Sequence, residues 1–142
     1  MNIINKKARF SYKLEGDRLE AGISLSGGEA KAVRTGHADL SQSVARVLNG
    51  ELYLVNANIP VVGAKNYTST RTRRLLLHKA EILALSTKAK QQKLTFVPMK
   101  LYTKGHLIKL ELVLGKPKAK FEKKEAIKRK DIQRELEREL KV

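Results

Sequence analysis

The chain has 142 residues, a length that fits one domain with an appendage, and 42% of them are apolar. It carries 30 Lys/Arg against 14 Asp/Glu, a formal net charge of +16. Such an excess predicts a polyanionic partner, RNA or DNA first. A membrane surface fits less well, because no stretch joins a basic face to an apolar aromatic face. The absence of cysteine excludes disulfides, thiolate metal sites and cysteine nucleophiles.

The first ten residues contain no apolar signal region, and no apolar run approaches the roughly 18 residues of a membrane span. We therefore expect a cytoplasmic protein that neither crosses a membrane nor is secreted.

The N-terminal stretch predicts a basic arm followed by two strands. Residues 1–7 form the arm, and residues 8–14 and 17–25 alternate apolar and polar side chains. Glu20 is polar within the second of these strands. On sequence alone it is interpreted as an exposed charge.

A short helix is predicted next. Ser26 and Glu29 have the spacing of a capping box, which starts a helix over 28–35 that ends at the following glycine. Lys31 and Arg34 share a face of this helix, which suits a phosphate, although ordinary solvation explains the pair equally well.

The middle of the chain predicts a hairpin and a basic loop. Asn49-Gly50 lies between alternating apolar runs within 40–59, and both residues accept the positive φ of a tight turn. We expect Pro60 to end the second strand.

A polar loop over 61–72 leads into Arg71, Arg73 and Arg74. The three arginines suit phosphate contacts, and Tyr67 in the loop suits base stacking. A solvated loop is the competing interpretation.

A long helix is predicted over 75–90, with an apolar stripe that begins at Leu75. Two strands follow, 94–103 and 107–114, joined by a turn at 104–106. Five to seven strands with one long and one short helix predict a mainly β protein, an OB-fold-like closed β-barrel.

The chain is expected to divide into a barrel at 1–115 and a basic tail at 116–142. The tail holds 11 Lys/Arg against six Asp/Glu. Its one-residue apolar stripe predicts a segment that is disordered alone and helical when a polyanion is bound. A helix packed back on the barrel and a coiled coil are the alternatives.

No catalytic pattern is present. His37, His78 and His106 are isolated, and no zinc-ligand pair, P-loop or nucleophile elbow occurs. We therefore expect a binding protein rather than an enzyme, with no metal and no cofactor.

Several segments together resemble the SsrA-binding protein (small protein B, SmpB) family, in the same order and at similar spacing. They are NKKAR (5–9), LEAGISLSGGEAKAVRTG (19–36), ELYLVNANI (51–59), TRTRRLLLHKAEI (70–82), VPMKLY (97–102) and the lysine-rich tail. The resemblance covers nearly the whole chain.

The resemblance implies a factor of trans-translation that binds transfer-messenger RNA (tmRNA, or SsrA RNA). Such a factor carries the alanine-charged RNA to ribosomes stalled on mRNA without a stop codon, where the incomplete peptide is tagged for degradation. The barrel would hold the tRNA-like domain, and the tail would enter the decoding centre and the empty mRNA channel. The implied chain is a monomer, and alanyl-tRNA synthetase and elongation factor Tu are indirect partners.

The resemblance also implies site residues. Glu20 and Asn5 match residues associated with tmRNA binding, which replaces the first interpretation of Glu20. The remaining residues expected to contact tmRNA are Lys6, Lys7, Arg9, Lys31, Arg34, Arg71, Arg73, Arg74 and Lys79. Those expected to reach the decoding centre are Lys116, Lys118, Phe121, Glu122, Lys123, Lys124, Ile127, Lys128 and Arg129.

The chain departs from the family pattern at Phe10, where a histidine is usual, at Gly28, where a β-branched or aromatic residue is common, and at Pro117, where a glycine is usual. Two other binding proteins remain as alternatives: a general single-strand-binding OB protein and a structural protein of the ribosome. An RNA-modifying enzyme is a more distant one.

Overall fold

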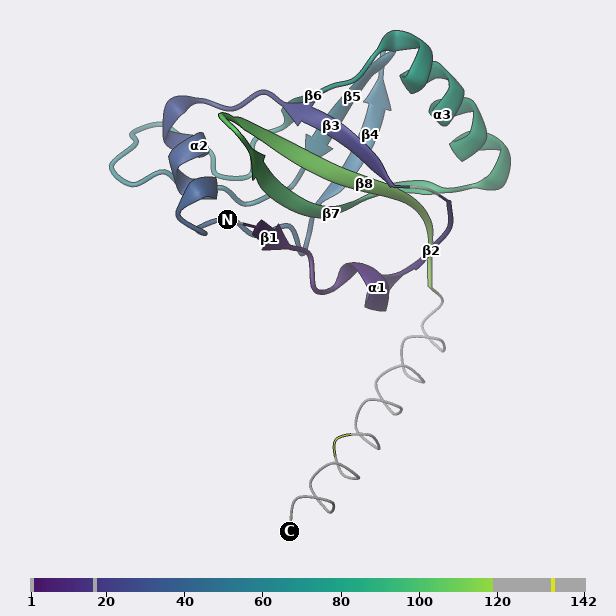
Figure 1. Ribbon diagram of the computed structural model, residues 1–142, viewed down its shortest axis with the longest axis horizontal. Coiled ribbons are helices and arrows are strands. Elements are labelled where there is room, and N and C mark those ends of the chain that lie inside the picture. The colour runs from purple at the N-terminus through teal and green to yellow at the C-terminus, as the bar shows by residue number, and fades with distance from the viewer. Residues whose placement is uncertain (1, 17, 119–133, 135–142) are drawn as a thin grey trace.

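The computed structural model describes residues 2–16, 18–118 and 134, and a closed β-barrel forms most of this part (Figure 1). Six antiparallel strands close it, in the order β7, β4, β5, β6, β3, β8 and back to β7. Their bounds are β3 (Leu19–Ile23), β4 (Val44–Leu48), β5 (Glu51–Val55), β6 (Arg73–Leu76), β7 (Thr95–Lys104) and β8 (Leu107–Pro117).

Shorter elements surround the barrel. Strand β1 (Asn2–Ile4) pairs with β7, and β2 (Tyr12–Leu14) pairs with β8. The helices are the single turn α1 (Ala8–Ser11), α2 (Gly27–Arg34) and α3 (Lys79–Gln92). Figure 1 shows α2 and α3 toward opposite ends of the barrel. The predicted mainly β, OB-fold-like barrel with one long and one short helix is confirmed.

The local signals for turns and caps are confirmed. Asn49 and Gly50 join β4 to β5 with φ values of 51° and 76°. Ser26 caps α2, since its Oγ accepts from the Glu29 N–H at 3.3 Å and its own N–H donates to Glu29 Oε1 at 2.9 Å. Gly36, with φ 81°, follows the end of α2.

The barrel interior is filled by the inward side chains of alternating strands. Leu52 and Leu54 on β5, Leu101 on β7, and Leu110 and Leu112 on β8 are all fully buried. Burial of each such side chain contributes about 1.5–3 kcal/mol. This core holds the strands rigidly, and their outward residues are placed at fixed positions on the surface.

The prediction for the stretch 8–14 is wrong in its first half. Residues 8–11 form α1, whose turn closes when the N–H groups of Phe10 and Ser11 donate to the Lys7 carbonyl at 3.1 and 2.9 Å. Only Tyr12–Leu14 is a strand.

The long helix begins at Lys79 rather than at Leu75, because the preceding residues form β6. In this strand Arg73 and Leu75 point inward, whereas Arg74 and Leu76 point outward. The alternation was hidden because one inward position is an arginine, a residue rarely found buried.

Two strand ends also differ from the prediction. Strand β5 ends at Val55, before Asn56 with φ 63°, so Pro60 does not end it. Strand β8 continues to Pro117 because β2 pairs with it there, with Tyr12 opposite Pro117. The strand predicted over 107–114 is therefore three residues longer at its C-terminal end.

Candidate nucleic-acid interface

The outer surface of β3 and β8 carries two glutamates in direct opposition. Glu20 on β3 is the register partner of Glu111 on β8. Like charges across two strands destabilise a sheet, so such a pair needs compensation from its surroundings. Arg18 and Lys100 provide it for Glu111, at 3.2 and 3.6 Å.

The Glu20 carboxylate contacts two side chains of β7. The Tyr102 hydroxyl donates to Glu20 Oε2, and Lys104 Nζ lies 3.4 Å from Oε1. The bond from Tyr102 lowers the pKa of Glu20; partial burial opposes this, and the charges of Lys104 and Lys109 lower the pKa further. Glu20 therefore presents an ionised carboxylate at neutral pH, a group that only accepts hydrogen bonds.

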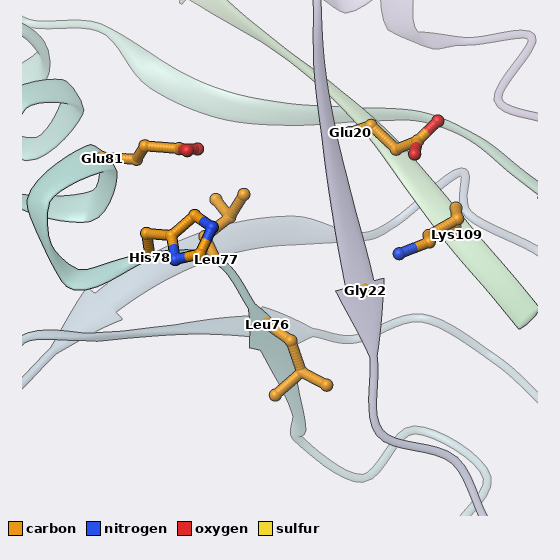
Figure 2. Close-up of a pocket in the computed structure, with 7 residues that line it drawn as sticks. All are labelled: Glu20, Gly22, Leu76, Leu77, His78, Glu81 and Lys109. Carbon is orange, nitrogen blue, oxygen red and sulfur yellow. The ribbon is translucent and has the colours of Figure 1, made fainter.

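A groove of about 430 Å³ opens beside this carboxylate, as Figure 2 shows. Glu20 and Lys109 lie on one side of it, and His78 and Glu81, at the start of α3, lie on the other. Residues Gly22, Leu76 and Leu77 complete the lining. The groove thus combines two carboxylates, one ammonium group and an imidazole with an apolar surface.

Gly22 keeps the groove open at its centre. It is the register partner of Leu76 on β6 and of Lys109 on β8. A Cβ atom at position 22 would lie 3.2 Å from Leu76 Cβ. The glycine lets a ligand approach the strand backbone, while Leu76, which is 52% exposed, offers an apolar contact.

A second hollow shares Gly22, Leu76 and Lys109 with the first and extends toward α2. Arg34 lies at its far end, where its Nη2 donates to the His106 carbonyl at 2.9 Å. Lys31 is exposed one turn earlier on α2.

Arg71 and Arg73 lie in a different environment, around the buried carboxylate of Glu29. Arg73 Nε donates to Glu29 Oε2 at 2.7 Å, and Arg71 pairs with the same carboxylate through Nε and Nη2. The Tyr67 hydroxyl donates to it at 2.9 Å. Burial alone would raise the pKa of Glu29, but these hydrogen bonds, with Arg71 first, lower the pKa to about 2.

Arg73 is fully buried, and its guanidinium also donates to the carbonyls of Ala57, Ser69 and Arg71. The structure therefore places Arg73 inside the fold and not at an RNA surface. Of the three expected arginines, Arg74 faces outward most fully and pairs with Glu51 at 3.0 Å.

The other expected residues are distributed over two more surfaces. Lys79 lies with Lys90 along a groove between α3 and the β4–β5 hairpin. Lys6, Lys7 and Arg9 are exposed in the N-terminal arm.

The tail begins next to this arm. Lys118 donates from its backbone N–H to the Ser11 carbonyl and from Nζ to the Arg9 carbonyl, at 2.9 and 2.8 Å. Lys116 belongs to β8, opposite Lys13. The remaining expected tail contacts lie outside the described residues: Phe121, Glu122, Lys123, Lys124, Ile127, Lys128 and Arg129.

Sequence reasoning missed several residues of the Glu20 groove. Tyr102 and Lys109 occupy polar positions of strands that were predicted, whereas Lys104, the last residue of β7, was assigned to the turn between them. The predicted turn implied the pairing of β7 with β8, but no local signal predicted the pairing of β3 with β8, which brings the three residues to Glu20. His78 and Leu76 were assigned to a helix that begins later.

Within the described residues, no group of three or more His, Asp or Glu side chains could hold a metal ion. In the same part of the chain, no helix is both long and apolar enough to cross a membrane.

Comparison with known proteins identifies the family. The family model "SmpB protein" matches residues 2–142. The SsrA-binding protein of Halalkalibacterium halodurans is 45% identical over 96% of this chain and 90% of its own length. The SsrA-binding protein of Rubrobacter xylanophilus is 43% identical over 96% and 93%.

A solved structure agrees with these matches. It is described as "tmRNA-SmpB: a journey to the center of the bacterial ribosome" and superposes with a TM-score of 0.69 at 38% identity. The match covers 89% of this chain and 94% of the other. On the family model, the sequence identity and the shared fold together, this chain belongs to the SmpB family of SsrA-binding proteins.

Proposed function

We propose that this chain binds tmRNA (SsrA RNA) and delivers it to stalled ribosomes in trans-translation, so that the incomplete peptide is tagged for proteolysis. Membership in the SmpB family supports this function. The observation that carries it in the molecule is the open groove at Glu20 and Lys109, on a chain whose net charge is +16.

The chemistry of the groove suits RNA better than DNA. The ionised Glu20 carboxylate accepts hydrogen bonds from a base amino group or from the ribose 2′-OH, which DNA lacks. Lys109 and Lys104 neutralise phosphates beside it, and Leu76 contacts the face of a sugar or base. Lys31 and Arg34 extend the phosphate contacts toward α2. In this proposal the surface holds the tRNA-like domain of tmRNA.

The N-terminal arm and the tail form a second contact region in this proposal. Strand β8 and Lys118 fix the point at which the tail leaves the barrel. The tail, residues 116–142, then enters the decoding centre and the empty mRNA channel. Its 11 Lys/Arg are the cations that rRNA attracts.

The remaining parts of the proposal follow from this role. Alanyl-tRNA synthetase and elongation factor Tu act on the same RNA and meet this chain through it. The chain acts in the cytoplasm as a monomer and performs no catalysis itself.

The test compares the full chain with a fragment ending at Lys118, which retains all of β8. Each is assayed for binding tmRNA against excess bulk tRNA at physiological salt, and for rescue of stalled ribosomes. We expect both proteins to select tmRNA and only the full chain to support rescue.

Equal affinity for every RNA would contradict the proposal and indicate a general single-strand-binding protein. Permanent association with ribosomes in the absence of tmRNA would indicate a structural ribosomal protein instead.

A further inference from the structure

Helix α3 lies against the barrel with little of its surface buried. Two of its 14 residues, Ile82 and Ala89, are buried. Four others recur every three to four positions and therefore share one face of the helix: Lys79, Leu83, Ser86 and Lys90. Leu83 is 70% exposed. This face presents an apolar side chain between two lysines.

A groove runs along this face of α3. A hollow of about 500 Å³ separates the helix from the β4–β5 hairpin, and all four residues of the face line it. A second hollow, of about 470 Å³, extends from there to Tyr12. The two hollows share Val47, Ser86 and Lys90, so they form one continuous surface, which we call the α3 groove.

Strand β4 forms the other side of the α3 groove. It pairs with β5 through all five of its residues, whereas its register with β7 joins Ala45 to Phe96 alone among the described residues. Leu48, at the end of β4, is 55% exposed and lines the groove. Two large apolar side chains exposed in one groove, Leu48 and Leu83, indicate a contact surface.

The charged side chains of the α3 groove are mostly cations. Lys79 and Lys90 on α3 and Arg46 on β4 line it. Its one lining carboxylate, Glu51, already pairs with Arg74 at 3.0 Å. The groove therefore suits an apolar segment that carries acidic side chains.

The last twelve residues of the chain differ from the rest of the tail in charge. Residues 119–130 hold six Lys/Arg against two Asp/Glu, whereas residues 131–142 hold three Lys/Arg against four Asp/Glu. The end of this strongly basic chain is therefore the part of the tail that a basic groove attracts.

The same twelve residues carry the apolar stripe of the tail. Ile132, Leu136 and Leu140 are four positions apart, and on a helix they would form one row with Glu135 and Glu139 beside it. The row would rise about 12 Å, at 1.5 Å per residue. The face of α3 from Lys79 to Lys90 rises about 16 Å on the same measure, so the row fits the groove in length.

The tail also begins close to the α3 groove. Pro117, near the end of the described chain, is the register partner of Tyr12, which lines the near end of the groove. The residues between Lys118 and Ile132 would reach up to about 40 Å when extended. Chain length therefore permits the last twelve residues to reach any part of the groove.

We propose that residues 131–142 dock as a helix in the α3 groove of the same chain, with the apolar stripe against Leu48 and Leu83 and the acidic side chains near Lys79 and Lys90. A short flexible connection gives a local concentration in the millimolar range, so even a weak contact is populated. The docking needs no RNA and stands apart from the proposed function, in which the segment has to leave the groove before it enters the ribosome.

The test uses the full chain without RNA. Because the sequence contains no cysteine, Arg134→Cys provides a single attachment point for a nitroxide spin label. In the ¹⁵N-labelled chain we expect the label to broaden the backbone amide signals of Val47, Leu83 and Lys90. Signals of α2, which lies toward the opposite end of the barrel in Figure 1, should stay sharp.

A pair of matched variants tests the groove itself. Leu83→Ser in the labelled chain should abolish the broadening at Val47 and Lys90. Val62→Ser changes another exposed apolar residue, in the loop 56–72, and should leave the broadening intact. Leu136→Ser removes the middle of the stripe and should have the same effect as Leu83→Ser, without any change to the barrel.

Three results would overturn the proposal. The first is an absence of broadening in the α3 groove, and the second is broadening spread evenly over the surface. The third comes from a mixture of ¹⁵N-labelled chains without nitroxide and unlabelled chains with it. Broadening in this mixture as strong as within one chain would show that the segment docks on a second copy.

Discussion

Glu29 and Glu20 are both bordered by basic side chains, but one is enclosed by the fold and the other lies at the surface. The Glu29 carboxylate is fully buried and accepts hydrogen bonds from Arg71, Arg73 and Tyr67. The Glu20 carboxylate is partly exposed, faces Glu111 across the sheet, and lines an open groove.

This difference distinguishes charged groups that stabilise the fold from charged groups that are available to a ligand. Arg71, Arg73 and Tyr67 all bond to Glu29 within the protein, so this cluster fixes the loop 56–72 against α2. The sheet around Glu20 tolerates two opposed carboxylates, an arrangement that costs stability and leaves hydrogen-bonding capacity for a ligand. Arginine clusters in a sequence therefore indicate RNA contacts only where the fold leaves them exposed.

Removal of the buried carboxylate should have the largest effect. Glu29→Ala leaves Arg73 buried without a counter-charge, which should lower the free energy of unfolding by about 3–5 kcal/mol. Glu51→Ala removes the partner of the exposed Arg74 and should cost about 1 kcal/mol or less. Urea unfolding of both variants measures the difference. Similar losses would show that the Glu29 cluster is not a structural centre.

The pH dependence of stability should reveal the same cluster. The pKa of Glu29 is lowered from an ordinary 4.5 to about 2, so its contribution is complete above pH 4.5 and is lost as pH falls toward 2. A shift of this size corresponds to about 3 kcal/mol.

The Glu29→Gln variant provides the control, because it cannot titrate at this position. Urea unfolding between pH 5 and pH 2 should show a steeper loss for the unaltered chain than for the variant. Parallel curves would contradict the lowered pKa.

A smaller effect is expected where the loop packs on α2. A Cβ atom at Gly28 would lie 2.7 Å from Val61 Cγ1, whereas one at Gly27 meets nothing within 4 Å. Gly28→Ala should therefore destabilise the protein by roughly 1–3 kcal/mol, and Gly27→Ala should not. Adding Val61→Ala to Gly28→Ala should recover much of the loss in thermal unfolding. Equal melting temperatures for the two alanine variants would show that the contact is unimportant.

The sequence predicted correctly those elements that a few neighbouring residues determine. The Asn49-Gly50 turn and the Ser26–Glu29 capping box were predicted because a few adjacent residues determine each. Strand β6 was missed because its inward arginine conceals the alternation, and the Glu29 partner that makes this burial possible lies 44 residues away.

The candidate site was predicted in part for the same reason. Glu20 came from the family resemblance, and its polar position in a strand was visible. Its partners Tyr102, Lys104 and Lys109 come from β7 and β8, and they reach Glu20 through the pairing of β3 with β8, which no local signal predicted.

The central claim is that Glu29 stabilises the fold whereas Glu20 binds RNA. The most direct test is the tmRNA affinity of Glu20→Gln. Glu51→Gln serves as the control, and urea unfolding is measured for both variants. We predict that Glu20→Gln remains folded but binds tmRNA about tenfold more weakly, because the carboxylate accepts hydrogen bonds from the RNA. If Glu20 were only a negative charge near phosphates, its removal would strengthen binding. Unchanged or tighter binding by Glu20→Gln would contradict the account.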